Sequence, residues 1–255
     1  MGKTMMVTGA TRNTGYAVAK RFLKEGYDVC ITSRSQESAD EAAKKLMEMC
    51  PGRRVLSVSM DPGKIEDIRS AFKIIAKKFG HLNVFVPNAV DMGNLRNTMN
   101  VTPDYWDAVM NVNVRGYFFT CQEAIKLMKN GGSIVMIGSV HAHGGIPNKI
   151  CYSTSKAAVL GMMHCMAVEM SYLGIRVNAI TAGAIRTERW EEQDDTTTQK
   201  RRDQYPAGRE SFPDEIAGGV YYLCSDEAST IVGAELTIDS GISVCLLPYN
   251  KHWNA

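Results

Sequence analysis

Short apolar runs alternate with helix-like segments along this chain, and this alternation restricts the fold more than any other feature. Such alternation favours a parallel sheet, because each helix returns the chain to the edge where the next strand starts. We therefore predict an α/β fold with a doubly wound parallel sheet flanked by helices. The expected strands are 4–8, 28–32, 54–60, 82–86, 133–137, 176–181 and 234–239, and the expected helices are 16–25, 38–49, 65–79, 105–128, 152–172 and 213–224.

The chain is predicted to form one domain with one polar interruption. Its 255 residues, 45% of them hydrophobic, suffice for a sizeable core, and open α/β sheets reach this length. We predict a single domain over residues 1–255. Residues 188–211 are the most polar stretch and come directly after an expected strand. We interpret them as a lid over a ligand site, with a solvated surface helix as the alternative.

A glycine-bearing turn, Gly9 to Gly15, joins the first expected strand to the first expected helix. Backbone N–H groups of such a turn, together with the helix N-terminus behind it, bind a pyrophosphate. In open α/β sheets the ligand lies beyond the carboxyl ends of the strands, where Asp61, Asn88 and Ser139 follow their own strands. The sequence therefore predicts a dinucleotide site at this edge of the sheet.

The end of the second expected strand indicates which dinucleotide is bound. An acidic residue there binds the 2′-hydroxyl of an adenosine ribose, whereas a basic one accepts a 2′-phosphate. This chain has Ser33 and Arg34 at that position, and Arg12 in the glycine turn is a second cation. We predict NADP as the cofactor, with NAD as the alternative if these arginines are only solvated surface residues.

Tyr152 and Lys156 are four residues apart on an expected helix and therefore share one face. A nearby cation lowers the pKa of a tyrosine, ordinarily about 10, toward the working pH, where the phenol exchanges protons with a substrate oxygen. Ser139 follows the preceding strand and is placed to donate a hydrogen bond to the same oxygen. We predict acid-base chemistry at these residues, although the same spacing alone also suits an ordinary surface Tyr and Lys.

Several motifs together, in this order and spacing, resemble the short-chain dehydrogenase/reductase superfamily over nearly the whole chain. The glycine turn by itself is a weak signal, whereas four ordered motifs are strong. The resemblance implies a Rossmann-type fold and an oxidoreductase. The motifs are Thr8-Gly9 with Asn13 and Gly15, then Asn113-Val114-Arg115-Gly116, then Ser139 with Tyr152 and Lys156, then Asn178 to Gly183 followed by Thr187, with Gly233 and Ile238 to Gly241 as later signatures.

The resemblance also implies a role for each site residue. It implies that Tyr152 donates and accepts the proton and that Lys156 lowers the pKa of Tyr152 and holds the nicotinamide ribose. Ser139 is implied to polarise the substrate carbonyl, and Asn113 to support a proton relay. The implied cofactor contacts are Gly9, Arg12, Asn13, Gly15, Arg34, Asp61, Asn88, Tyr152, Lys156 and, near the nicotinamide amide, Thr187.

Four positions depart from the pattern of that family. Asn13 replaces the usual middle glycine, Pro87 and Val90 flank Asn88 where Asn and Gly are usual, and Ala182 replaces a proline. Asn tolerates positive φ better than other non-glycine residues, so we expect the turn to accommodate it. Pro87 removes a backbone donor and Val90 adds bulk, so these changes concern cofactor affinity and pocket shape more than the chemistry.

Composition excludes several other classes of protein. The 29 basic and 27 acidic residues give a net charge of +2 without a long basic run, so we expect neither nucleic acid nor a membrane as a partner. Seven scattered cysteines without a Cys-x-x-Cys pair indicate reduced thiols and no metal site. The apolar start of the chain is too short for a signal peptide, and we expect a cytoplasmic protein.

The leading hypothesis is an NADP(H)-dependent oxidoreductase that interconverts a secondary alcohol and a ketone. His141, His143, Asp91 and Asn94, with the polar lid, favour a sugar or polyol, while hydroxysteroids and 3-oxoacyl thioesters stay open as substrates. A non-catalytic dinucleotide sensor and a lyase or dehalogenase on the same scaffold are the rival functions. The apolar tail 242–247, together with the resemblance, predicts a homotetramer or otherwise a dimer.

Overall fold

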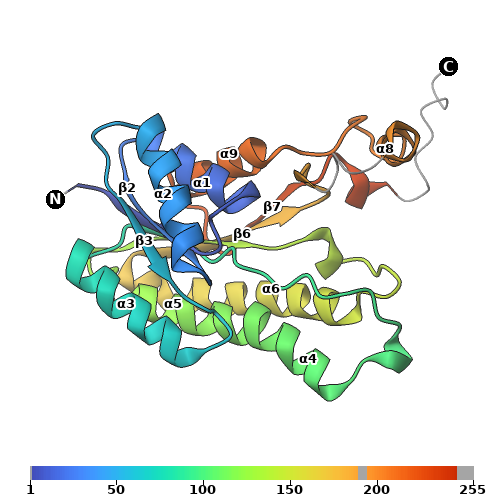
Figure 1. The fold of residues 1–255 in the computed structure, drawn as a ribbon, viewed down its shortest axis with the longest axis horizontal. Coiled ribbons are helices and arrows are strands. Elements are labelled where there is room, and N and C mark those ends of the chain that lie inside the picture. The colour runs from blue at the N-terminus through green and yellow to red at the C-terminus, as the bar shows by residue number, and fades with distance from the viewer. Residues whose placement is uncertain (1, 189–193, 246–255) are drawn as a thin grey trace.

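The computed structural model describes residues 2–188 and 194–245, with a seven-stranded parallel sheet at the centre (Figure 1). The strands follow the order β3-β2-β1-β4-β5-β6-β7, so the sheet is wound in both directions from β1 and β4. The predicted fold class, a Rossmann-type doubly wound sheet, is confirmed. The strands are β1 (Thr4–Val7), β2 (Asp28–Ser33), β3 (Val55–Ser59), β4 (Val84–Val86), β5 (Gly132–Ile137), β6 (Ile175–Ala182) and β7 (Glu235–Ile238).

Helices cover both faces of the sheet, as Figure 1 shows. One face carries α1 (Asn13–Lys24), α2 (Gln36–Met49) and α9 (Pro213–Cys224). The other carries α3 (Ile65–Phe79), α5 (Tyr117–Ile125) and α6 (Ile150–Met170), with α4 (Pro103–Met110) packed along α6. Among the described helices, none has the length and apolar character to cross a membrane.

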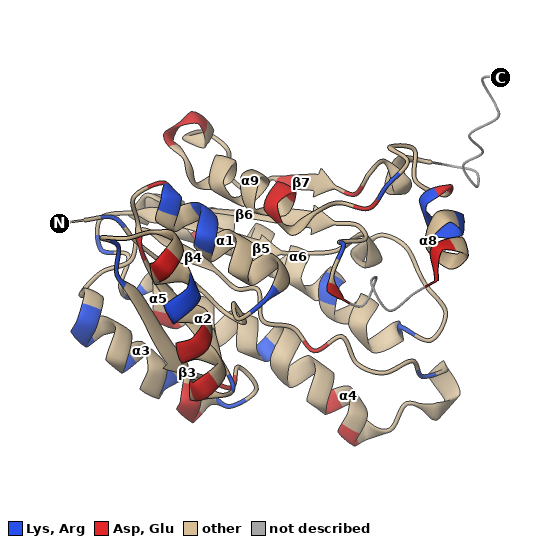
Figure 2. Cartoon of the chain, turned by 45° about the horizontal axis from the view of Figure 1, so that its top comes forward, with Lys and Arg blue, Asp and Glu red and all other residues tan. Residues whose placement is uncertain are grey.

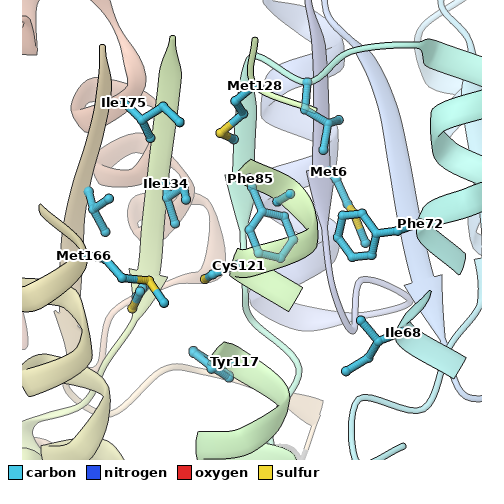
Figure 3. Packing of buried hydrophobic residues seen from close by; sticks show 14 of the residues in the cluster. Met6, Ile68, Phe72, Phe85, Tyr117, Cys121, Met128, Ile134, Met166 and Ile175 are labelled. Atoms are coloured by element: carbon cyan, nitrogen blue, oxygen red, sulfur yellow. The ribbon is translucent and has the colours of Figure 1, made fainter. Parts of the chain in front are cut away.

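Each face of the sheet has its own apolar core. Successive side chains of a strand point to opposite faces, so Met5 of β1 packs beneath α1, while Met6 packs beneath α3. This is why the strands are continuous apolar runs rather than alternating ones. Figure 3 shows the second core, in which Phe72 and Phe85 meet edge to face with ring centroids 6.1 Å apart.

The predicted bounds of α3 and α9 agree with the structure. The predicted helix 105–128, in contrast, does not exist as one regular helix. It is divided into α4, a π-helical segment over Asn111–Gly116 and α5. Gly116 ends that segment, and a Cβ there would lie 2.5 Å from the carbonyl oxygen of Pro62. The asparagines and glycine that weaken a helix therefore mark a wide turn, the kind of insertion that is frequent at functional sites.

The predicted lid and tail are only partly described. Within 188–211 the structure contains α8 (Asp195–Arg202), while 189–193 lie outside the described residues. Of the apolar tail, Ile242–Val244 form a 3-10 turn, and residues 246–255 lie outside the described part. Figure 2 shows that α2 and α8 each carry both acidic and basic residues.

Candidate functional site

The glycine turn adopts a conformation that suits a phosphate group. Gly9 has φ of 63°, and Asn13 has φ of 51°, which confirms that asparagine accommodates positive φ in place of the usual glycine. A Cβ on Gly15 would lie 2.5 Å from the Gly9 carbonyl oxygen, so only glycine fits there. Among the described residues, no side chain caps α1, whose first turn also has no acidic residue. Its free N–H groups and this close turn fit a dinucleotide pyrophosphate.

Asn88 braces this turn from the end of β4. Its Nδ2 donates to the carbonyl oxygens of Thr8, at 2.9 Å, and Gly9, at 3.0 Å. The hydroxyl of Thr8 in turn accepts hydrogen bonds of 2.9 Å from the backbone N–H groups of Asn88 and Ala89. The structure thus gives Asn88 a positioning role, and its direct contact with a cofactor stays a prediction.

The predicted ribose and phosphate residues follow the carboxyl ends of β1, β2 and β3. Arg34 is exposed, directly after β2, and its carbonyl oxygen accepts a hydrogen bond from Ser59. Arg12 is also exposed and forms an ion pair of 3.7 Å with Glu188. Asp61 accepts a hydrogen bond of 3.0 Å from the N–H of Gly63. The two exposed guanidinium groups carry the charge that a 2′-phosphate requires.

The predicted catalytic residues lie together where β5 ends and α6 begins. Tyr152 and Lys156 lie one helical turn apart on α6, and Ser139, just past β5, donates a hydrogen bond toward the Tyr152 phenol. Lys156 is only 2% exposed, and its Nζ donates to the carbonyl oxygen of Ile137 at 2.7 Å. The same Nζ lies 5.7 Å from the centroid of the Tyr152 ring. The structure therefore brings all three residues to one site.

The expected effect of the Lys156 charge on the pKa of Tyr152 stays a prediction. Burial is the main influence on both groups: it raises the pKa of Tyr152 above 10.0, and it lowers the pKa of Lys156 to about 7. The Ser139 hydrogen bond lowers the pKa of Tyr152 only in part. The influence of burial was not foreseeable from the sequence, because spacing along a helix predicts proximity, whereas desolvation depends on tertiary packing.

Asn113 is buried in the π-helical segment and holds two other segments together. Its Nδ2 donates to the carbonyl oxygen of Asp91 at 2.8 Å and to the Ser155 hydroxyl at 3.0 Å. Its Oδ1 accepts from the Asp91 N–H at 2.8 Å. Both amide hydrogens are thus in use, and the structure gives Asn113 a positioning role. Its part in a proton relay stays a prediction.

Thr187 is half-buried after β6, beside an ionic cluster that the sequence did not reveal. Glu210 is 1% exposed and accepts hydrogen bonds of 3.0 and 2.9 Å from Arg202 and one of 3.4 Å from Arg186. This carboxylate joins α8 to the segment that carries Thr187. Eight and twenty-four residues separate Glu210 from its partners, and no motif marks that spacing.

The polar residues expected near the substrate are divided between several places. The His141 ring lies edge to face with Tyr152, at 5.2 Å between centroids, whereas His143 contacts Glu235 of β7 at 2.6 Å. His143 is therefore not beside Tyr152. The backbone of Asp91 is bound by Asn113, and the Asp91 carboxylate accepts a hydrogen bond of 2.8 Å from the N–H of Gly93. Beside Tyr152 the surface has a small recess, too narrow to admit a water molecule, and its polar lining is Asn94, Arg96, Tyr105, Asn148 and Lys149.

Comparisons with known proteins agree with this geometry. Residues 9–243 match the family described as enoyl-(acyl carrier protein) reductase. Glucose 1-dehydrogenase 2 of Bacillus subtilis is 33% identical over 247 residues, which cover 95% of each chain. L-rhamnose-1-dehydrogenase of Scheffersomyces stipitis is 33% identical over 253 residues, 96% of this chain and 97% of that one.

Two further similarities span the same length. The 3-oxoacyl-(acyl-carrier-protein) reductase of Thermotoga maritima is 33% identical over 250 residues, 95% of this chain and 98% of that one. The solved structure of a short-chain dehydrogenase/reductase from Serratia marcescens has a TM-score of 0.88 at 32% identity, and the similarity covers 95% of this chain and 98% of the other.

Proposed function

Because this chain belongs to the short-chain dehydrogenase/reductase superfamily, we propose that it is an NADP(H)-dependent oxidoreductase that interconverts a secondary alcohol and a ketone. The observation that carries the proposal is the grouping of Ser139, just after β5, with Tyr152 and Lys156 of α6. A rival non-catalytic sensor would not need this grouping. A lyase or dehalogenase would not need the glycine turn that fits a pyrophosphate.

Three side chains perform the acid-base part of the reaction. The Tyr152 phenol donates a proton to the carbonyl oxygen during reduction and accepts it back during oxidation. Its raised pKa keeps it protonated, as the reductive direction requires. Ser139 donates a hydrogen bond to the same oxygen and stabilises its developing charge. The Lys156 ammonium, held by Ile137, supplies positive charge beside the phenol.

The nicotinamide nucleotide supplies the hydride in reduction and accepts it in oxidation. The residues that would hold its pyrophosphate are Gly9, Asn13 and Gly15 with the N-terminus of α1. Arg12 and Arg34 support the choice of NADP, because two guanidinium groups suit a 2′-phosphate. We assign Thr187 to the nicotinamide end and residues 188–211 to a lid, as the family resemblance implies.

A sugar or polyol is the substrate class we favour. The support is that two relatives are named for glucose and rhamnose, and that polar side chains able to bind hydroxyl groups line the surface recess beside Tyr152. The alternative is a 3-oxoacyl thioester, since a relative of equal identity is named for that reaction. Hydroxysteroids remain a third candidate from the sequence alone.

Turnover on a panel tests both parts of the proposal. Aldoses, polyols, hydroxysteroids and 3-oxoacyl thioesters are each offered with NADPH or NADP⁺ and with NADH or NAD⁺. We expect the highest kcat/KM for a sugar or polyol with the phosphorylated cofactor. A preference for NADH overturns the cofactor assignment, and turnover restricted to thioesters overturns the substrate assignment. Cofactor binding without turnover on any class favours the sensor.

We also propose that the chain assembles as a homotetramer or, failing that, a dimer. Val168 and Tyr172, at and beyond the end of α6, are 80% and 82% exposed, which is unusual for side chains of this size. Burial against a second copy removes this apolar surface from water. Light scattering at micromolar concentration measures the mass, and a fully active monomer contradicts the assembly. The cytoplasmic location stays an expectation from the sequence.

A further inference from the structure

Tyr117 is a buried aromatic residue whose position the catalytic assignment leaves unexplained. It opens α5 directly after the π-helical segment, is 2% exposed, and lies at the edge of the apolar cluster in Figure 3. Its ring centroid lies 5.3 Å from the Nζ of Lys156. Its hydroxyl donates to the carbonyl oxygen of Ile137 at 3.4 Å, the oxygen that also accepts from Lys156.

Within the described part of the chain, few other groups stabilise the ammonium of Lys156. An ammonium group has three donor hydrogens, and burying its charge is costly unless nearby groups compensate. One hydrogen bond, to Ile137, accounts for one donor. The Nζ lies near two phenol rings, with centroids at 5.3 Å for Tyr117 and 5.7 Å for Tyr152. Both distances fall within the range of about 6 Å over which a ring face attracts a cation.

We propose that Tyr117 is a positioning residue for the reaction, whose ring face stabilises the Lys156 ammonium and keeps it beside Tyr152. The ring carries this effect rather than the hydroxyl, because an O–H···O distance of 3.4 Å is long for a hydrogen bond. Without the ring, the buried amine loses its proton at lower pH and no longer presents a charge to the phenol. The inference concerns the charge on Lys156 and does not depend on the substrate or on the nucleotide.

The other titratable groups around Lys156 do not supply this stabilisation. Tyr152 faces it from its own helix, and His141, whose ring lies edge to face with Tyr152, has its pKa lowered mainly by burial. Cys121 lies one turn further along α5, and burial raises its pKa, so it is a neutral thiol. Burial is the influence that lowers the pKa of Lys156, and no carboxylate of the described residues offsets it.

The titration of Lys156 in the free chain tests the proposal directly. The chain is labelled with ¹³C at the lysine ε-carbon, and the Lys156 signal is assigned by its loss in Lys156→Met. Its midpoint is then compared between the native chain, Tyr117→Phe, which keeps the ring, and Tyr117→Leu, which removes it. We expect Tyr117→Leu to lower the midpoint by about one pH unit and Tyr117→Phe to leave it nearly unchanged.

A matched control separates the ring effect from loss of packing. Phe72→Leu removes an equally buried ring from the same core, away from Lys156, and lowers thermal stability without moving the midpoint. The proposal is overturned if Tyr117→Leu leaves the midpoint unchanged, or if Tyr117→Phe lowers it as much as Tyr117→Leu. If Tyr117→Leu does not fold, fluorinated phenylalanines at position 117 replace it. The midpoint then falls with each added fluorine if the proposal holds and stays constant if it is wrong.

Kinetics supply a second readout that simple destabilisation would not produce. The pH profile of kcat/KM reports ionisations of the free enzyme, so its alkaline limb moves to lower pH in Tyr117→Leu and stays in place in Tyr117→Phe. An unmoved limb in Tyr117→Leu contradicts the proposal. The titration needs neither cofactor nor substrate, so an unexpected cofactor preference or substrate would leave its result intact.

Discussion

The side chain of Asn113 binds the backbone of Asp91 through two hydrogen bonds of 2.8 Å, one donated by Nδ2 and one accepted by Oδ1. A third bond, of 3.0 Å, reaches Ser155 on α6. The π-helical turn thus holds both the loop after β4 and the helix that carries Tyr152.

Asn113→Leu is expected to lower the free energy of unfolding by about 2–3 kcal/mol, because it leaves partly buried polar groups without partners. Turnover falls as well, since the loop after β4 loses its anchor. Urea unfolding and kcat measure the two effects. Asn111→Leu, in the same π-helical segment, is the control, because none of the side-chain hydrogen bonds of the described residues involves Asn111. Equal stability of the two variants contradicts the positioning role.

Tyr152→Phe is expected to lower kcat by about a hundredfold or more while cofactor affinity and thermal stability change little, because only the exchangeable proton is lost. Steady-state rates and a cofactor fluorescence titration measure this. Tyr222→Phe removes the same hydroxyl from a 40% exposed position on α9 and should be silent. Near-native turnover by Tyr152→Phe would show that another group handles the proton.

Arg34→Ala is expected to weaken NADPH binding about tenfold or more, since charge-assisted hydrogen bonds are worth about 1.5–3 kcal/mol, while NADH binding barely moves. Arg12→Ala should have the same selectivity. Lys44→Ala, an exposed cation on α2, controls for the general loss of positive charge. Titration of each variant with NADPH and with NADH measures the two affinities. Equal losses of affinity for NADPH and NADH would mean that Arg34 has a structural role.

Lys156→Met is expected to abolish turnover and yet stabilise the chain below pH 7. The folded-state pKa of Lys156 is about 7, against 10.5 ordinarily, so within that window the unfolded chain binds more protons and stability rises with pH. The variant lacks this rise. Its free energy of unfolding exceeds that of the native chain by an amount on the order of a few kcal/mol, and this difference shrinks as pH increases. Urea unfolding across the window measures it. Lys126→Met, at an exposed position, is the control. If the difference in free energy of unfolding between Lys156→Met and the native chain does not change with pH, the burial argument is refuted.

Glu210→Ala is expected to lower the free energy of unfolding by about 1–3 kcal/mol, because it leaves Arg186 and Arg202 without their buried carboxylate. Arg202 holds the pKa of Glu210 below 4.5, so the contribution is complete above that pH and is lost as pH falls further. Asp214→Ala breaks an exposed pair with Lys20 and should cost less than about 1 kcal/mol. Thermal unfolding compares them, and similar costs would mean that Glu210 does not anchor α8.

The sequence by itself determined the features that depend on local pattern. The apolar runs and helix periods predicted every strand of the sheet, and the bounds of α3 and α9 agree with the structure. Local constraint also explains Gly15, whose position admits no side chain, and Asn13, whose positive φ suits asparagine. The grouping of Ser139, Tyr152 and Lys156 was predictable because parallel strands end at one edge and residues four apart share a helix face.

Tertiary structure alone decided what depends on burial and on partners distant in the chain. The pKa of Lys156 falls because packing removes water from the amine, which no spacing of residues reveals. His143 lies beside Glu235, ninety-two residues away, rather than beside Tyr152. The close approach of the Pro62 carbonyl to Gly116, and of the Tyr117 ring to Lys156, joins segments that are far apart in the sequence. Desolvation and long-range contact are properties of the packed chain, so the charge at this site was settled by folding.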